Sequence, residues 1–345
     1  MVDGVVELEG SANEERELRP QDGSITCWLF RAESAPTQID LEDLPELVRH
    51  DENLVWVDLE GYEEDHLRNL IQPFGLHEIS VRSALSSWQR PRLDIFPDSF
   101  FVSTTIARLD PQGFRVQASQ LDLFVGANYL VSAHKLPLPF SDRIMARSWS
   151  NPALVQHDSA FMLYIVLDEL LGYHEDLRED LQVHVERMEQ RALTDTSDVY
   201  LQDLIELKRY GFALRQLVDH HRAVFQGFVR PDFPFLEGDG VSGYFRDLDV
   251  RLGRLLDDLT VAREAVNGAF DIYVSHVSHR TNNIIKILTI VSAVLFSDTL
   301  VVSFFGTSFG NAIPIYTRTG FVVMISILVL LDMAILYAFR QQQWI

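Results

Sequence analysis

The fold of this chain is decided by two apolar stretches, ILTIVSAVLFSDTLVVSFFGTSF at residues 287–309 and GFVVMISILVLLDMAILYAF at residues 320–339. They contain 23 and 20 residues, and each carries a single charge, Asp298 in the first and Asp332 in the second. A helix of about 20 residues crosses the hydrocarbon core of a bilayer. A buried core helix of a soluble protein is the alternative, but two such stretches in succession favour two membrane spans.

Basic residues lie at the outer ends of both stretches. Arg280 and Lys286 precede the first stretch and Arg340 follows the second, so the positive-inside tendency places both outer ends in the cytoplasm. Residues 310–319 then form a short external loop, and residues 340–345 form a cytoplasmic tail. We therefore expect a multi-pass protein of the inner or plasma membrane, with two spans and with both termini in the cytoplasm.

The composition excludes several classes of function. The 345 residues include 29 Lys plus Arg and 50 Asp plus Glu, a formal charge of −21, whereas nucleic-acid phosphates require a basic face. A single cysteine, Cys27, excludes internal disulfides and a cysteine-based zinc cluster, and we interpret it as a small apolar filler. Residues 1–24 are acidic and lack the basic start and apolar run of a secretory signal, which predicts a disordered tail.

A very long helix leads into the first apolar stretch. No proline lies between Pro234 and Pro314, and apolar side chains follow a helical pattern from Ser242 onward. A continuous helix over residues 242–305 would be about 96 Å long at 1.5 Å per residue. We therefore treat residues 242–309 as one stalk helix that becomes the first span. No single small domain buries such a helix, so we expect several copies of the chain to shield one another.

One face of this helix is polar for a membrane span. At 100° per residue, a set of positions falls within about 60° of Phe296, and an acid further toward the cytoplasm falls near the same line. This pore seam comprises Asn282, Ile285, Thr289, Ser292, Phe296, Thr299 and Ser303, with Asp271 as the acid. Polar groups in hydrocarbon need partners or water, which favours a water-lined pore. Ser and Thr also serve as small contacts between packed helices, and that alternative stays open.

The upstream residues divide into two parts. Residues 25–150 alternate β-like runs, such as ITCWLF and LVWVDL, with helical stretches, and this α/β pattern predicts a cytoplasmic domain. Residues 151–241 predict a cytoplasmic helical hairpin whose many acids form a solvated face. The adjacent His220 and His221 point about 100° apart on a helix, so we interpret them as surface or interhelix residues and not as metal ligands. We find no nucleotide-binding glycine loop and no Ser/His/Asp set, and we assign no catalytic residue and no enzymatic activity.

Together these features resemble the CorA-type family of divalent-cation channels and transporters, which includes the ZntB branch. The resemblance is carried by VWVDL (55–59), WQRPRLDIF (88–96), LFVGANYLVSAH (123–134), NNIIKILTIVSAVLF (282–296) and the ending FRQQQWI. It implies an α+β membrane protein that assembles as a homopentameric funnel, with a pore lined by the first transmembrane helix of each subunit. Asn282, Ile285, Phe296 and Thr299 match pore positions of the family, and Asp271 matches an acid at the cytoplasmic mouth.

The chain departs from the family at the end of the first span. The family places Gly-Met-Asn there, whereas the matching positions are Gly306, Thr307 and Ser308. By resemblance these three residues form the selectivity filter. Oxygen acceptors suit the waters of a hydrated divalent cation, but a Ser308 hydroxyl reaches less far than an Asn side chain and would widen the ring. The ion selectivity of the family therefore does not carry over to this chain on the motif alone.

A second departure concerns metal sensing in the cytoplasm. Family members that sense Mg²⁺ bridge subunits with acids, and Asp247 matches one of them, so Asp247 and Asp271 are the candidate metal-binding acids. The acidic pair expected before the Gln-Arg-Pro segment is replaced by Arg82 and Ser83. Because a basic residue repels a bridging metal, we expect Mg²⁺-dependent closure to be weak or absent.

Two acids lie within the predicted spans. Asp298 is 11 residues before Phe309 and Asp332 is 12 residues after Gly320, which gives them nearly the same depth in antiparallel helices. Asp298 is about 200° from Phe296 and should face the second span. Neighbouring buried carboxylates do not both ionise readily, so one should hold a proton. That proton either couples to cation movement or forms a shared hydrogen bond that fastens the spans together.

The interpretation that unites these features is a homopentameric, CorA-like channel or transporter in a lipid membrane. Its cargo is a divalent cation, with Mg²⁺ or Zn²⁺ foremost and Co²⁺ or Ni²⁺ as further candidates, and no cofactor is expected. One alternative is a membrane-anchored scaffold or regulator that keeps the fold but has lost selective conduction. Another is a soluble coiled-coil adaptor, which requires both apolar stretches to pack internally.

Overall fold

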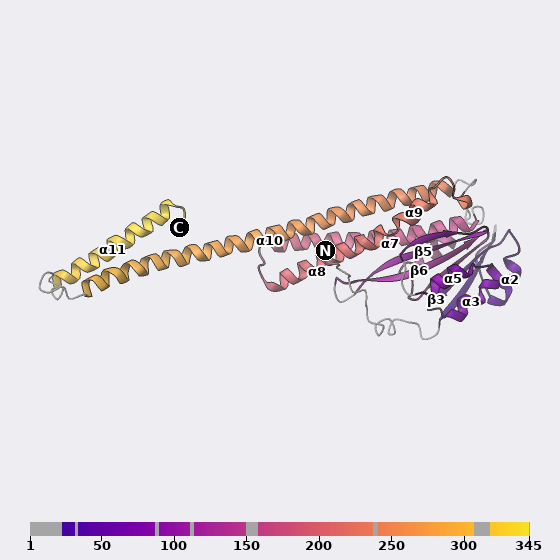
Figure 1. Cartoon of the computed structure of the whole chain (residues 1–345), viewed down its shortest axis with the longest axis horizontal. Coiled ribbons are helices and arrows are strands. Elements are labelled where there is room, and N and C mark those ends of the chain that lie inside the picture. The colour runs from indigo at the N-terminus through magenta and orange to yellow at the C-terminus, as the bar shows by residue number, and fades with distance from the viewer. Residues whose placement is uncertain are drawn as a thin grey trace. The chain divides into compact units, whose positions relative to one another are not determined.

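The computed structural model describes residues 23–31, 34–86, 90–110, 114–149, 158–236, 241–306 and 318–344 (Figure 1). Nearly all of the predicted acidic tail, residues 1–24, and most of the predicted external loop, residues 310–319, lie outside the described residues. The chain forms two compact units. The first comprises the described residues up to Arg191 together with Ser197–Ala269, and the second comprises Ala192–Thr196 together with the described residues from Phe270 onward.

Among the described residues, seven strands form one mixed sheet in the first unit. They are β1 (Ser24–Phe30), β2 (Thr37–Ile39), β3 (Leu54–Glu60), β4 (Arg92–Ile95), β5 (Ser99–Leu109), β6 (Val116–Gly126) and β7 (Tyr129–His134). Their order is β2-β1-β3-β7-β6-β5-β4, in which β3 and β7 are parallel and the other neighbouring pairs are antiparallel. The apolar, β-branched and aromatic runs seen in the sequence therefore become the central strands, where such residues pack well.

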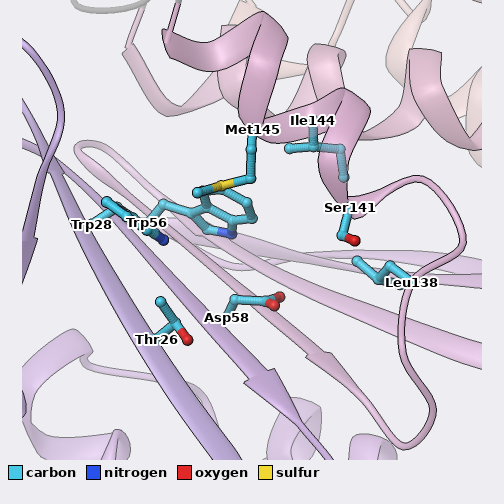
Figure 2. Close-up of a pocket in the computed structure, with 8 residues that line it drawn as sticks. All are labelled: Thr26, Trp28, Trp56, Asp58, Leu138, Ser141, Ile144 and Met145. Atoms are coloured by element: carbon cyan, nitrogen blue, oxygen red, sulfur yellow. The ribbon is translucent and has the colours of Figure 1, made fainter.

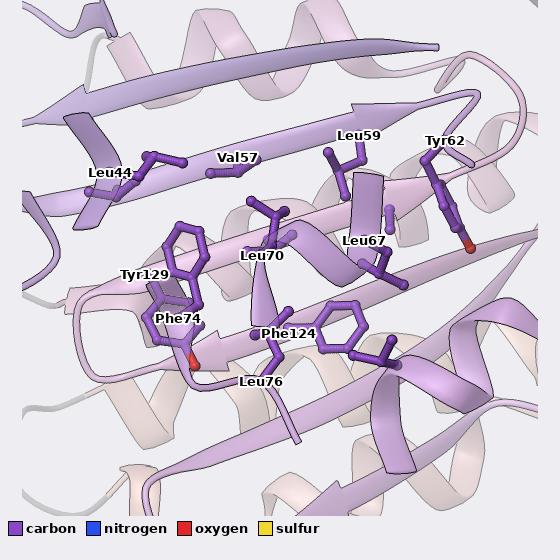
Figure 3. Packing of buried hydrophobic residues seen from close by; sticks show 14 of the residues in the cluster. Leu44, Val57, Leu59, Tyr62, Leu67, Leu70, Phe74, Leu76, Phe124 and Tyr129 are labelled. Carbon is purple, nitrogen blue, oxygen red and sulfur yellow. The ribbon is translucent and has the colours of Figure 1, made fainter. Parts of the chain in front are cut away.

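Short helices cover one face of this sheet. They are η1 (Leu41–Asp43), α2 (Leu44–Leu47), α3 (Glu64–Asn69), α4 (Ile71–Phe74) and α5 (Glu78–Leu85). Figure 3 shows the apolar core between the two layers, with Leu59 and Phe124 of the sheet close to Leu67 and Leu70 of the helices. Cys27 belongs to the same core and is 3% exposed, which confirms its interpretation as a filler.

Longer helices pack against the opposite face. They are α6 (Ser141–Trp149), α7 (Asp158–Ala192), α8 (Asp198–Asp219) and α9 (Arg222–Phe228), followed by η3 (Pro234–Leu236). Phe100 of β5 packs edge-on against Phe228 of α9 and Phe233, with ring centroids 6.3 and 5.3 Å apart. Ser197 caps α8 by accepting a hydrogen bond from the amide of Tyr200. The sheet is therefore buried on both faces.

Two buried histidines accept hydrogen bonds from backbone amides of β5 that have no strand partner on that side. Strand β4 pairs only with residues 100–103 of β5, which leaves the amides beyond them without a strand partner on that side. The amide of Thr105 donates to Nε2 of His221 at 3.0 Å, and the amide of Ala107 donates to Nε2 of His174 at 3.2 Å. Both rings must be neutral at Nε2 to accept these bonds. Burial lowers the pKa of His221 to about 4 and, with the adjacent His221 ring, lowers that of His174.

Two sequence expectations about these helices are corrected. His221 is not a surface residue: it is 2% exposed, lies between α8 and α9 with its ring 5.6 Å from that of His174 in α7, and also binds the edge of β5. The acids of α7 do not form a uniformly solvated face, because Asp168 and Glu169 are largely buried and pair with arginine. In both cases the partner lies far away in the sequence, so local periodicity contains no sign of it.

The fold ends in two apolar helices. Helix α10 runs without interruption from Val241 to Gly306, and α11 runs from Arg318 to Gln341. Both are long and apolar enough to span a membrane, and almost none of either apolar stretch is buried within the chain. The predicted fold class is thus confirmed, with an N-terminal α/β part and a long helix that continues into the first of two apolar C-terminal helices. Internal packing of the apolar stretches, which a soluble adaptor requires, is not observed.

Candidate functional site

The predicted pore seam lies open along α10. All of its members are exposed in the single chain, from Asp271 at one end to Ser303 at the other. Phe296 is 73% exposed and Ile285 is 52% exposed. No other described part of the chain covers this face. It is therefore available to water or to another subunit.

The seam presents oxygen acceptors. The hydroxyl of Thr289 donates to the carbonyl of Ile285 at 2.7 Å, and that of Thr299 donates to Leu295 at 2.7 Å. These bonds satisfy the hydroxyl hydrogens within the helix and leave oxygen lone pairs facing outward. Such groups accept hydrogen bonds from the waters of a hydrated cation.

A different face of α10 contacts α11, which runs back alongside its C-terminal part in Figure 1. The less exposed positions form one stripe on each helix. The stripes comprise Ile290, Ala293, Val294, Ser297, Asp298, Val301 and Phe305 on α10, and Met324, Leu328, Leu331, Asp332, Ile335 and Phe339 on α11. At 100° per residue the centre of the α10 stripe lies about 140° from Phe296, and Ala293, at about 60°, is the member nearest the seam. The helix therefore separates the face that binds α11 from the face that stays open.

Asp298 and Asp332 meet between these stripes. The two side chains lie within hydrogen-bonding reach of each other. Oδ1 of each is buried and has no hydrogen-bond partner among the described residues. Two carboxyl groups in contact share a proton more readily than they hold two negative charges, above all in hydrocarbon. The structure thus brings the two predicted acids together, while their role stays a prediction.

The ends of the second unit carry polar and aromatic contacts. Nζ of Lys286 lies 6.0 Å from the centroid of the Trp344 ring, which also contacts Phe339 at 5.4 Å. Arg280 donates to the hydroxyl of Thr196 at 2.5 Å. Two of the three basic residues that set the predicted topology, Arg280 and Lys286, thus have side-chain contacts, and the amphipathic Trp344 ring favours a membrane interface.

The described residues do not bring the predicted metal-binding acids together, and most of the predicted filter lies outside them. Gly306 is the last residue of α10, and Thr307 and Ser308 lie outside the described residues. Asp271 and Asp247 are exposed and lie in different units. Within the described ranges, no group of three or more His, Cys, Asp or Glu side chains is placed to hold a metal ion.

Helix α10 is anchored in the first unit by an ion-pair network that was not foreseen. Asp168 of α7 is 8% exposed, and each of its carboxylate oxygens pairs with a different arginine, Arg147 of α6 and Arg251 of α10. Arg147 also pairs with Glu169 at 3.0 Å, and Arg251 with Glu175 at 2.7 Å. Because these charges are largely withdrawn from water and each has a partner, the network fixes the position of α10 against α6 and α7.

The fold and the site together define a class of protein: a two-span membrane protein whose α/β unit precedes a long helix with an open polar face. The chain belongs to the CorA family, because the family model described as "CorA-like Mg2+ transporter protein" matches residues 51–341, most of the chain.

Individual relatives are distant but extend over most of both chains. The chain is 23% identical over 292 residues to "Cobalt/magnesium transport protein CorA" of Thermotoga maritima, covering 84% of this chain and 83% of the relative. The complete structure of the CorA magnesium transporter from Methanocaldococcus jannaschii superposes with a TM-score of 0.79 at 18% identity, covering 93% and 98% of the two chains. The full-length CmaX protein gives a TM-score of 0.73 at 18% identity with the same coverage. At these identities the structural likeness is one of fold.

Proposed function

We propose that this protein conducts a divalent metal cation through a homopentamer, along an axis lined by the seam of α10 from each subunit. The observation that carries the proposal is the division of α10 into two faces. One face binds α11 through a mostly apolar stripe, and the other stays exposed and bears a column of hydroxyl, amide and carboxylate groups. A helix that only anchored a domain in lipid would not favour such a column.

The side chains of the seam suit a gated cation path. Five Asp271 carboxylates at the cytoplasmic mouth would favour cations over anions. Rings of Ile285 and Phe296 would close the path by excluding water when they approach one another, and Asn282 and Thr299 would offer oxygen to hydrated ions between them. In this proposal each hydrophobic ring acts as a gate, and the polar positions carry the ion with its waters.

Mg²⁺ is the first candidate ion, since the family is described by Mg²⁺ transport and the Thermotoga maritima relative is named for cobalt and magnesium. Gly306, Thr307 and Ser308 replace the family's filter residues, so we propose that discrimination among Mg²⁺, Co²⁺, Ni²⁺ and Zn²⁺ is weaker than in a Gly-Met-Asn protein. The filter ring would then be wider and would hold the hydrated ion less tightly.

The proposed arrangement places residues 25–150 and 151–241 in the cytoplasm. Residues 310–319 form the external entrance, and residues 340–345 return to the cytoplasm. Because Arg82 occupies a position where the family has an acid, we propose that millimolar Mg²⁺ does not lock the assembly in a symmetric closed form. A symmetric closed pentamer that appears only with Mg²⁺ would contradict this part of the proposal.

Uptake into proteoliposomes tests the proposal. Purified, intact oligomer is reconstituted, and entry of Mg²⁺, Co²⁺, Ni²⁺ and Zn²⁺ is followed with ion-sensitive dyes. We expect saturable entry of at least one of these ions. Absence of all four fluxes in a demonstrably intact oligomer would instead support the alternative, a membrane-anchored scaffold or regulator that has lost selective conduction at Thr307 and Ser308.

Proton coupling is a second, separable proposal, and it is supported by the contact between Asp298 and Asp332. A shared proton at mid-membrane depth can be exchanged as the two spans move. The test is cation uptake by Asp298→Asn with and without a pH gradient. Retained uptake that no longer responds to the gradient supports coupling. Loss of the oligomer, seen by size-exclusion chromatography, supports the fastening role instead.

A further inference from the structure

Four side chains form a square on the sheet face that α6 covers. Strands β1 and β3 pair so that Trp28 lies opposite Trp56 and Thr26 lies opposite Asp58. Because side chains alternate along a strand, all four project from the same face. Two indole rings are thus placed beside one carboxylate and one hydroxyl.

A pocket lies between this square and α6. Its volume is about 160 Å³, and Leu138, Ser141, Ile144 and Met145 complete its lining (Figure 2). This volume lies below the roughly 300–1,000 Å³ that is usual for sites of drug-sized ligands, so the pocket suits only a small ligand. At its rim, Trp149 meets Trp28 edge-on with centroids 5.6 Å apart. Three of the five tryptophans of the chain therefore lie in or beside one pocket.

The carboxylate of Asp58 is held in a fixed orientation by groups behind it. Oδ1 accepts hydrogen bonds from the hydroxyl of Ser132 and from Nε2 of His134 at 3.1 Å. Nδ1 of His134 lies 2.8 Å from the carbonyl of Leu136, so both ring nitrogens face oxygen acceptors, an arrangement that favours the protonated imidazole. Burial lowers the pKa of His134, but the Asp58 carboxylate outweighs this effect and the net pKa is raised.

The second oxygen of Asp58 is available to a ligand. Oδ2 forms no hydrogen bond or ion pair within the described part of the chain, and the side chain is 21% exposed. Figure 2 shows the carboxylate reaching toward the space below α6. Elsewhere in this protein one carboxylate pairs with two cations, because each oxygen of Asp168 pairs with a different arginine.

We infer that this pocket binds a small organic cation, a primary ammonium with an aromatic or aliphatic body. The ammonium group has three N–H donors, and three of the residues that line the pocket, Asp58, Thr26 and Ser141, carry side-chain oxygens. The body lies against Trp28 and Trp56, whose ring faces attract cations and apolar groups alike. A quaternary ammonium fits less well because it cannot donate, and a neutral alcohol lacks the charge. The site lies wholly in the first unit and does not depend on the proposed ion path.

Isothermal titration calorimetry of the full-length protein with 2-phenylethylammonium tests the inference. The expected result is saturable binding of one molecule per chain with Kd below about 1 mM. The isosteric neutral probe 2-phenylethanol should bind at least about tenfold more weakly. Absence of saturable binding, or equal affinity for the alcohol, overturns the proposal.

Variants locate the binding site. Asp58→Asn should weaken binding at least about tenfold, whereas Asp65→Asn, an exposed acid on α3, should leave it unchanged. If Asp58→Asn fails to fold, Thr26→Val is the deciding test of the binding site, because it keeps the shape of the side chain and removes the hydroxyl acceptor. Thr26→Val should weaken binding about threefold. Wild-type affinity in a folded Asp58→Asn, or in Thr26→Val when Asp58→Asn cannot be prepared, contradicts the assignment.

Discussion

Replacing Asp168 by alanine should loosen α10 from the first unit. The carboxylate of Asp168 is the only acceptor that Arg147 of α6 and Arg251 of α10 share among the described residues. Its side chain is 10% exposed, and the two arginine side chains are 33% and 25% exposed. The substitution therefore removes two hydrogen-bonded ion pairs from a poorly hydrated site.

The stability lost in Asp168→Ala depends on the ion pairs that the two arginines keep. A hydrogen bond to a charged group contributes about 1.5–3 kcal/mol, and breaking an isolated buried pair costs about 3–5 kcal/mol. Here neither arginine loses all its partners, because Arg147 keeps Glu169 at 3.0 Å and Arg251 keeps Glu175 at 2.7 Å. We therefore expect a loss of about 2–3 kcal/mol in the free energy of unfolding.

Thermal unfolding of the full-length protein at a fixed scan rate measures this loss. At roughly 2–4 °C per kcal/mol, Asp168→Ala should lower Tm by about 4–12 °C. The matched control is Asp176→Ala, which breaks a 2.9 Å ion pair between Arg143 and an aspartate side chain that is 59% exposed. Surface pairs contribute about 0–1 kcal/mol, so the control should shift little. Equal shifts in both variants would refute the anchoring role of Asp168.

Two further predictions concern the first unit. The unfolding free energy should fall as pH decreases from about 6.5 toward 4, by roughly 3 kcal/mol from His221 alone, because the unfolded state binds a proton that the buried neutral ring excludes. His174 acts in the same direction because its pKa is also lowered. Denaturant titrations of His221→Gln should show a smaller fall in the unfolding free energy over this pH range. An unchanged fall would contradict the buried, neutral state of His221 at the edge of β5. Gly75→Ala should destabilise by about 1–2 kcal/mol because its φ is +62°, although its Cβ meets no atom within 4 Å. Gly172→Ala in α7, where the added Cβ also meets no atom within 4 Å and φ is not positive, should stabilise by roughly 0.5–1 kcal/mol. If both substitutions changed the stability in the same direction, φ would not be the cause.

The main elements of the fold follow from local sequence patterns. Apolar runs such as LVWVDL become buried strands, and the proline-free segment from Ser242 becomes one continuous helix. Two predominantly apolar stretches of 23 and 20 residues fix the C-terminal helices. These patterns are readable because burial and lipid exposure act on consecutive or regularly spaced residues.

The contact between Asp298 and Asp332 also follows from the sequence, because counting residues from a short connection gives their depth. The exposed seam follows from helical angle alone. The helical angle does not show what the exposed face of α10 contacts. The choice between a pore and a helix contact at Ser292 therefore depends on neighbouring subunits.

The contacts that hold α10 and complete the sheet were not predictable in this way. Arg251 reaches Asp168 across 83 positions, and His221 reaches Thr105 across 116. Such pairs leave no periodic trace, since each partner alone is indistinguishable from a surface charge or a surface histidine.

Thiol accessibility of the seam tests the central claim most directly. The chain has one cysteine, Cys27, which is buried and whose pKa is raised by burial to about 11, so it should not react. Ser292→Cys places a thiol on the seam, and Ser326→Cys places a matched thiol on the exposed surface of α11. With Mg²⁺ uptake into proteoliposomes as the readout, a charged, water-soluble thiol reagent should block Ser292→Cys and spare Ser326→Cys. Block of Ser326→Cys alone, or full flux through a fully modified Ser292→Cys, would contradict an ion path along the seam of α10.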